Sequence, residues 1–170
     1  NVGVTYDPMR NELWGGEKGT QPTLNGKTFR VSERADLAEA VISVGLSKTG
    51  VTIAAGLPLL QEMVRRARKC RLMGSAALDM AYVACGRFDA YIEQGISLWV
   101  IAAGWLLVET AGGLVEMKQR TDMEEKYSIT AANVVHDLEL QRASHQVGPA
   151  HAAQHHPPPP TRRPPGTELP

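Results

Sequence analysis

The aromatic residues of this 170-residue chain all lie within residues 1–143 and are absent from residues 144–170. The second stretch instead holds eight of the 11 prolines and four of the five histidines. Segments rich in proline and poor in apolar side chains cannot bury enough surface to offset the conformational entropy lost on folding. We therefore expect a folded part, residues 1–143, and a disordered tail, residues 144–170, with polyproline II character around residues 157–160.

The charges of the chain exclude several classes of partner. Its 18 basic and 18 acidic side chains balance, so the chain has no net positive charge with which to attract nucleic acids or anionic membranes. The longest uncharged run of the folded part, residues 94–108, has 15 residues, whereas a membrane span needs about 20, so we expect a buried helix there. Two cysteines form no disulfide framework, and no signal peptide is visible, which together favour a cytoplasmic location.

Alternating strand and helix patterns predict a layered, mixed α/β architecture. We expect strands at residues 2–6, 12–14, 28–31, 40–44, 88–93, 114–117 and 127–130. We expect helices at residues 54–69, with Pro58 in the first turn, from Ser75 to the residue before Gly86, at 100–111 and at 133–142. Asn25 and Gly26 predict a type I′ hairpin, because both residue types tolerate a positive φ.

Three stretches of the sequence carry a resemblance to a known family. The first, at residues 4–32, reads VTYDPM, then LNGK, then VS. The second, at residues 71–91, reads RLMGSAALDMAYVACGRFDAY, and the third, at residues 93–113, reads EQGISLWVIAAG closed by ETAGG. In order and spacing, residues 2–134 resemble the C-terminal half of the inositol monophosphatase family. The resemblance implies a mixed sheet flanked by helices, as part of a layered αβαβα fold whose N-terminal, metal-binding half is absent here. We accordingly expect that the chain begins inside a larger fold.

The family's enzymes are magnesium-dependent phosphomonoesterases, which need several carboxylates to hold metal ions against a phosphoryl group. In the family most of these carboxylates come from the N-terminal half, through a glutamate and an Asp-Pro-Ile/Leu-Asp-Gly-Thr motif. Asp7 and Pro8 start a similar string, but the chain has Arg10, Asn11 and Glu12 where the motif has Asp, Gly and Thr, and so it does not match.

The family's remaining metal ligand is the aspartate of a Trp-Asp-x-Ala-Ala-Gly motif. Here the motif begins Trp99-Val100, and a valine cannot coordinate magnesium. Magnesium is thus implied by the resemblance, but we expect this chain alone to hold neither a metal ligand nor a catalytic residue.

The resemblance places the substrate side of the site in this chain. Glu93 matches the family glutamate that accepts hydrogen bonds from a substrate hydroxyl, and Gly74, Ser75 and Ala76 match a helix start that lines the same pocket. Taken alone, Ser75 is equally explained as a helix N-cap, and Glu93 as a solvated strand end.

The three tryptophans and two cysteines have simpler explanations. We interpret Trp14, Trp99 and Trp105 as core residues and the two cysteines as inert thiols.

Three functions remain open. The first is an inositol monophosphatase family polypeptide, inactive by itself, whose parent reaction hydrolyses inositol phosphates, and which could form a homodimer as the family does. The second is a non-catalytic remnant or pseudoenzyme that acts by binding a partner. The third is a nucleotide or sugar phosphate phosphatase of the same superfamily. In the first and third, the partner is a small phosphomonoester.

Overall fold

The computed structural model describes residues 1–46 and 49–133, which form two β-sheets and three α-helices. The smaller sheet is antiparallel, with strand order β1-β2-β3-β4. Its strands are β1 (Val2–Asp7), β2 (Glu12–Glu17), β3 (Thr23–Leu24) and β4 (Lys27–Thr28).

The larger sheet is mixed, with strand order β6-β5-β7-β9-β8. Its strands are β5 (Val41–Gly45), β6 (Lys69–Arg71), β7 (Ala90–Ile96), β8 (Leu114–Gln119) and β9 (Tyr127–Ala132). Strand β5 pairs in parallel with both β6 and β7, whereas β9 pairs antiparallel with β7 and β8. A short 3-10 helix, η1 (Leu37–Glu39), precedes β5.

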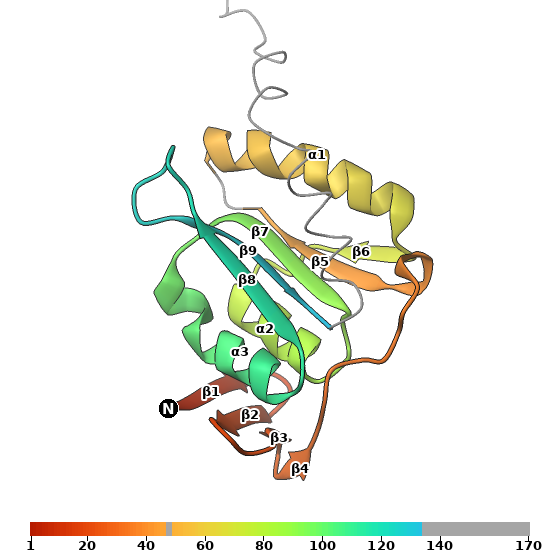
Figure 1. The fold of residues 1–170 in the computed structure, drawn as a ribbon, viewed down its shortest axis with the longest axis vertical. Coiled ribbons are helices and arrows are strands. Elements are labelled where there is room, and N and C mark those ends of the chain that lie inside the picture. Colours follow the sequence, from red (N-terminus) through yellow and green to blue (C-terminus); the bar gives the residue numbers. More distant parts are fainter. Residues whose placement is uncertain (47–48, 134–170) are drawn as a thin grey trace, which may run out of the picture.

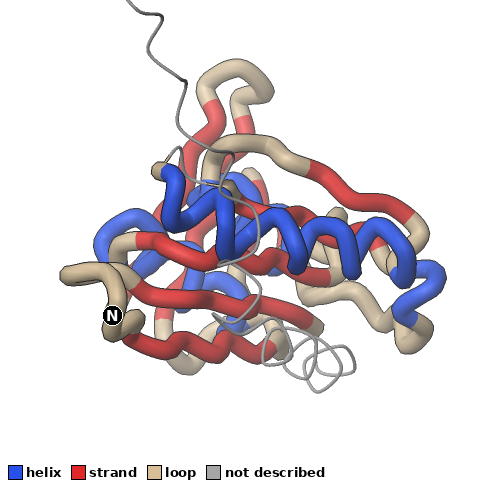
Figure 2. Tube along the Cα trace, turned by 90° about the horizontal axis from the view of Figure 1, so that it is seen from above, coloured by secondary structure: helices blue, strands red, loops and turns tan. Residues whose placement is uncertain are grey.

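The elements stack in four layers (Figure 1). Helix α1 (Gly50–Arg66) covers one face of the larger sheet and lies over its strands in the view from above (Figure 2). Helices α2 (Ala76–Ala84) and α3 (Leu98–Thr110) fill the space between the two sheets. The order α1, large sheet, α2 with α3, small sheet confirms the predicted layered α/β class.

Two apolar clusters hold the layers together. One lies between the sheets around Trp14, Met80 and Leu107, and the other lies under α1 around Ile42 and Met63. Helices α2 and α3 approach closely because residue 104 is glycine. A Cβ atom there would stand 2.4 Å from the Cβ of Met80. The long uncharged run is thus largely a buried helix, and no helix in the described ranges is long and apolar enough to span a membrane.

Helix α1 differs from its predicted bounds. It begins at Gly50, because Thr49 and Thr52 cap its first turn reciprocally, and it ends at Arg66, where the chain turns into β6. Pro58 therefore lies in the middle of the helix, and its prediction as a first-turn residue was wrong. The missing N–H costs one helical hydrogen bond there.

The region after the first hairpin also departs from expectation. The type I′ turn is confirmed, with φ values of 50° at Asn25 and 80° at Gly26. The strand predicted at residues 28–31 is wrong beyond Thr28, because Val31 instead packs against the inter-sheet cluster and donates its N–H to the carbonyl of Ala111. The helix predicted at 133–142 and the tail at 144–170 lie outside the described residues, apart from Asn133, which is not helical.

Candidate functional site

A cavity of about 370 Å³ opens where the parallel strands β5 and β7 end and the helices α2 and α3 begin. Ligands of α/β proteins commonly bind at such carboxyl ends of parallel strands. The cavity is lined by Gly45, Leu46, Gly74, Ser75, Ala76, Ala77, Asp79, Glu93, Ile96 and Val100. All four residues predicted to bind substrate therefore meet at one cavity, together with Val100, whose position the resemblance assigns to the family's aspartate.

The start of α2 forms one wall of this cavity. Gly74 has a φ of 76°, a left-handed conformation that glycine adopts without strain, and it turns the chain into the helix. Ser75 occupies the N-cap position, but its side chain makes no capping hydrogen bond, so the capping interpretation is wrong for its hydroxyl. Ala76 opens the helix with a side chain small enough to leave the cavity free.

Glu93 forms the floor of the cavity together with Gly45, its register partner on β5. A Cβ at residue 45 would stand 2.2 Å from Oε2 of Glu93, so glycine is required where the carboxylate lies over β5. Only 7% of Glu93 is exposed, and its Oε2 accepts a hydrogen bond from the Tyr91 hydroxyl. Glu93 is therefore a buried, oriented acceptor, and the alternative of a solvated strand end is wrong.

Asp79 is a second buried carboxylate on the cavity wall, and the sequence analysis missed it. Only 1% of the residue is exposed, and Oδ1 accepts a hydrogen bond of 2.6 Å from the Ser43 hydroxyl. Burial raises the pKa of Asp79 to about 6; the hydrogen bond from Ser43 opposes this increase and the negative charge of Glu93 adds to it. A signal was present, since Asp79 is the one charged residue of the otherwise small and apolar helix α2.

One lysine moderates the negative charge of the cavity. Burial raises the pKa of Glu93, whereas the hydrogen bond from Tyr91 and the positive charge of Lys126 oppose the increase. Lys126 Nζ donates to Ser97 Oγ over 2.7 Å, at the residue that precedes α3. The cavity thus has two carboxylates that accept hydroxyl hydrogen bonds, and the charge of Lys126 lies close enough to act on Glu93.

Val100 lies in the first turn of α3, and its side chain forms part of the apolar wall. Within residues 1–46 and 49–133, no group of three or more His, Cys, Asp or Glu side chains could hold a metal ion. Magnesium is usually bound through one or two charged carboxylates together with waters and substrate phosphates. Asp79 and Glu93 are buried, already accept hydroxyl hydrogen bonds and have raised pKa values that disfavour their charged forms, so with Val100 beside them they do not fit the ion. The described part of the chain therefore offers no magnesium site of its own.

The tryptophans divide by environment. Trp14 is fully buried and Trp105 is half-buried, but Trp99 is 71% exposed, so its assignment to the core was wrong. The side chain points outward from the first turn of α3, where Lys126 Nζ stands 6.0 Å from the ring centre.

The two cysteines match their interpretation as inert thiols. Both are half-buried, and burial raises the pKa of the Cys70 and Cys85 thiols, so little of either is present as reactive thiolate near neutral pH.

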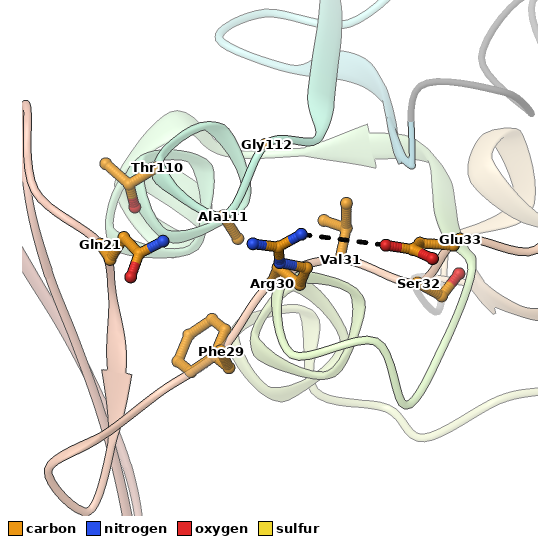
Figure 3. A pocket seen from close by; sticks show the side chains of 9 residues that line it. All are labelled: Gln21, Phe29, Arg30, Val31, Ser32, Glu33, Thr110, Ala111 and Gly112. Carbon is orange, nitrogen blue, oxygen red and sulfur yellow. Dashed lines mark ion pairs between the residues drawn. The ribbon is translucent and has the colours of Figure 1, made fainter.

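A second cavity, of about 480 Å³, lies at the C-terminal end of α3 (Figure 3). The segment after β4 forms its other side, and Arg30 and Glu33 make an exposed ion pair of 3.9 Å there. None of the predicted substrate-binding residues lines this cavity, and both charged side chains are strongly exposed. It offers no buried polar group to orient a ligand comparable to Glu93.

Comparison with known proteins identifies the family. The sequence profile described as the inositol monophosphatase family matches residues 1–153. The chain belongs to the inositol monophosphatase family. It is 46% identical over 113 residues to the Nus factor SuhB of Xylella fastidiosa, covering 66% of this chain and 41% of that protein. It is 40% identical over 144 residues to the inositol-1-monophosphatase of Mesorhizobium japonicum, covering 84% of this chain and 53% of that protein.

Solved structures of the family share the fold. The inositol monophosphatase from Anabaena superposes with a TM-score of 0.77 at 35% identity, covering 89% of this chain and 61% of that one. The extragenic suppressor protein suhB from Bartonella henselae gives a TM-score of 0.76 at 36% identity, covering 84% and 55%. The chain thus spans about half the length of the relatives that it matches.

Proposed function

We propose that the cavity of about 370 Å³ beside Glu93 and the start of α2 binds the hydroxyl-rich part of a small phosphomonoester of the inositol phosphate class. The observation that carries the proposal is the meeting of Glu93 with Gly74, Ser75 and Ala76 at one cavity, although about 20 residues separate the two segments. Family membership and the similarity to an inositol-1-monophosphatase support the same ligand class.

The lining suits a polyol ring. A carboxylate offers several acceptor sites, so Glu93 can bind two neighbouring hydroxyls in addition to the Tyr91 hydroxyl that orients it. The first backbone N–H groups of α2 have no partner within the helix and can donate to ligand oxygens. Ile96 and Val100 supply an apolar wall for the C–H faces of the ring.

We further propose that this chain alone binds such a ligand without hydrolysing it. The family's reaction relies on magnesium to activate water and to neutralise the phosphoryl group. The residues of the described part do not fit that metal, because a valine stands beside only two buried carboxylates. Hydrolysis therefore belongs to a complete family polypeptide and not to this chain.

Calorimetric titration of the purified chain with myo-inositol 1-phosphate, in the presence of a chelator, tests the binding. We expect Glu93→Gln to weaken binding by about tenfold, since hydrogen bonds to a charged group contribute roughly 1.5–3 kcal/mol. Glu116→Gln on strand β8 is the matched control and should leave the affinity unchanged. Equal affinities for wild type and Glu93→Gln would refute the assignment.

The absence of turnover needs its own measurement. Phosphate release from myo-inositol 1-phosphate should stay at the level of the buffer with and without magnesium. Magnesium-dependent release that a chelator abolishes would show that the chain hydrolyses its ligand after all.

A non-catalytic, partner-binding role is the second candidate. Val100 favours it, because the resemblance implies a metal-binding aspartate at this position, whereas the residues that the resemblance implies for the substrate side are present in the cavity wall. The name Nus factor, which the Xylella relative carries, is also compatible with a role other than hydrolysis. In that case Glu93→Gln would weaken ligand binding and leave the partner interaction intact.

A further inference from the structure

Lys126 lies near the Glu93 cavity and has no carboxylate bound to it. Its Nζ donates to Ser97 Oγ over 2.7 Å and stands 6.0 Å from the ring centre of Trp99. Among residues 1–46 and 49–133, no carboxylate forms an ion pair with Lys126. Burial raises the pKa of Glu93, and the positive charge of Lys126 opposes this increase, so the two side chains are close enough to interact. A half-buried ammonium group that bonds only to a hydroxyl has donors left for a ligand.

Ser97 adds a second donor at the same place. It is only 3% exposed and lies between Ile96 and Val100, which both line the cavity. It occupies the N-cap position of α3, but its side chain makes no capping hydrogen bond. Its Oγ accepts from Lys126, and no atom in the described ranges accepts the hydroxyl proton. Buried hydroxyl groups normally donate as well, and the first N–H groups of α3 also lack partners within the helix. An ammonium, a hydroxyl and a helix N-terminus therefore offer donors in one small region.

The loop that joins β8 to β9, residues 120–126, holds Lys126 in this position. The N–H of Arg120 donates to the carbonyl of Lys126 over 2.8 Å and closes the loop. The side chain of Arg120 fixes the loop to β7, because Nη1 donates to the carbonyl of Gln94 over 3.1 Å. Gln94 directly follows Glu93 on that strand. Backbone contacts thus set the position of Lys126 relative to Glu93, as a ligand that bridges the two side chains requires.

We propose that Lys126 and Ser97 form an anion subsite, which binds the phosphate of the ligand whose hydroxyl groups are bound by Glu93. The inference rests on the proposed function and adds which residues meet the phosphate when no metal is bound. Asp79 and Glu93 repel a phosphate dianion, so binding is favourable only where a cation compensates its charge. In the described part of the chain, Lys126 is the cation that acts on these carboxylates. The N-terminus of α3 favours negative charge at the same place.

Calorimetric titrations of the full chain, with a chelator present, test the subsite with myo-inositol 1-phosphate, myo-inositol and inorganic phosphate. We expect Lys126→Gln to weaken the binding of both phosphate-bearing probes by about tenfold, because it removes a charge-assisted hydrogen bond, and to leave that of myo-inositol unchanged. Lys126→Arg keeps the charge and should restore most of the affinity. Lys69→Gln is the matched control, because Lys69 is exposed and pairs with Val41 at the start of β5, the end of the sheet away from the cavity. It should change none of the three affinities.

The three probes separate this inference from the proposed function. Equal weakening of myo-inositol and myo-inositol 1-phosphate in Lys126→Gln would mean that Lys126 acts only through Glu93, and it overturns the subsite. So does unchanged binding of both phosphate-bearing probes in that variant, a loss as large in Lys126→Arg, or binding of neither probe by the wild type. Glu93→Gln should weaken myo-inositol 1-phosphate without weakening inorganic phosphate. If the wild type binds inorganic phosphate through Lys126 but binds myo-inositol 1-phosphate no more tightly, the subsite stands and the proposed function fails.

Discussion

Asp79 and Asp89 lie ten residues apart and are both almost fully buried, but their surroundings differ. Asp89 receives a guanidinium and a backbone amide: Arg34 Nη1 lies 3.0 and 3.1 Å from its two oxygens, and the N–H of Val41 donates over 2.7 Å. Asp79 receives the hydroxyl of Ser43, and its pKa is raised. One carboxylate is compensated by a cation, and the other is not.

The difference separates a structural role from a functional one. The Asp89 cluster joins distant parts of the chain, because Ser32 also donates to Asp89, and Asn133 Nδ2 donates to the carbonyls of Ser32 and Arg34. It fixes the segment before η1 to the end of β9 and lines no candidate substrate site. Asp79 instead lines the cavity beside Glu93, where two poorly compensated carboxylates are costly unless a ligand or proton meets them.

Asp89→Ala should have the largest effect of the changes considered. It leaves the amide of Val41 and the hydroxyl of Ser32 without their acceptor and takes away the partner of Arg34. The side chain of Arg34 is 42% exposed and stays solvated, so the cost comes chiefly from the orphaned amide and hydroxyl. Each unsatisfied buried group costs about 1–3 kcal/mol of unfolding free energy, which urea denaturation measures. Asp122→Ala, which removes the half-exposed partner of Arg120, is the control and should cost less than about 1 kcal/mol. Similar losses in the two variants would remove the distinction drawn for Asp89.

Asp79→Asn should alter the dependence of stability on pH. The folded-state pKa of Asp79 is raised from 3.8 to about 6, so its contribution to stability is fully present below about pH 4 and is lost as the pH rises through 6. The loss amounts to about 3 kcal/mol in wild type, since one pKa unit corresponds to about 1.4 kcal/mol. Asparagine does not titrate and still offers an acceptor to Ser43, so the variant should show a flatter profile.

Urea unfolding of both proteins between about pH 4 and pH 7 measures this difference, and other carboxylates largely cancel in the comparison. Glu116→Gln, on the edge strand β8, serves as a control that should leave the profile as in wild type. Parallel profiles for wild type and Asp79→Asn would mean that Asp79 is compensated like Asp89.

The contrast also explains what the sequence could predict. Glu93 and Gly74 were expected to line one pocket because the family resemblance places them there, Glu93 six residues before Trp99 and Gly74 at the start of a helix. Asp79 was missed because its burial depends on Ser43, a residue 36 positions earlier on another strand. Local patterns cannot report such a contact.

The predicted start of α1 and the predicted environment of Trp99 were wrong for a related reason. The capping pair of Thr49 and Thr52 starts α1 four residues before its apolar pattern, and this moved Pro58 into the helix interior. Trp99 was assigned to the core together with the other two tryptophans, but it lies in the first turn of α3 and is 71% exposed. Alternation and the family motifs therefore sufficed for the fold class, whereas side-chain environments required the tertiary structure.

Val100→Asp should have the smallest effect on stability and would sharpen the contrast further. It adds a third carboxylate to a cavity that already holds Asp79 and Glu93 without a paired cation. Val100 is 39% exposed and lies in the first turn of α3, where a negative charge is favoured, so the repulsion should cost at most about 1 kcal/mol at neutral pH.

The control is Val100→Asn, because asparagine has the shape of aspartate without its charge. The difference in urea midpoint between the two variants isolates the repulsion. We expect this difference to shrink as the pH falls toward about 4, because the carboxylates become neutral. Val100→Asp alone should release no phosphate from myo-inositol 1-phosphate with magnesium, and such a release would show that three carboxylates suffice.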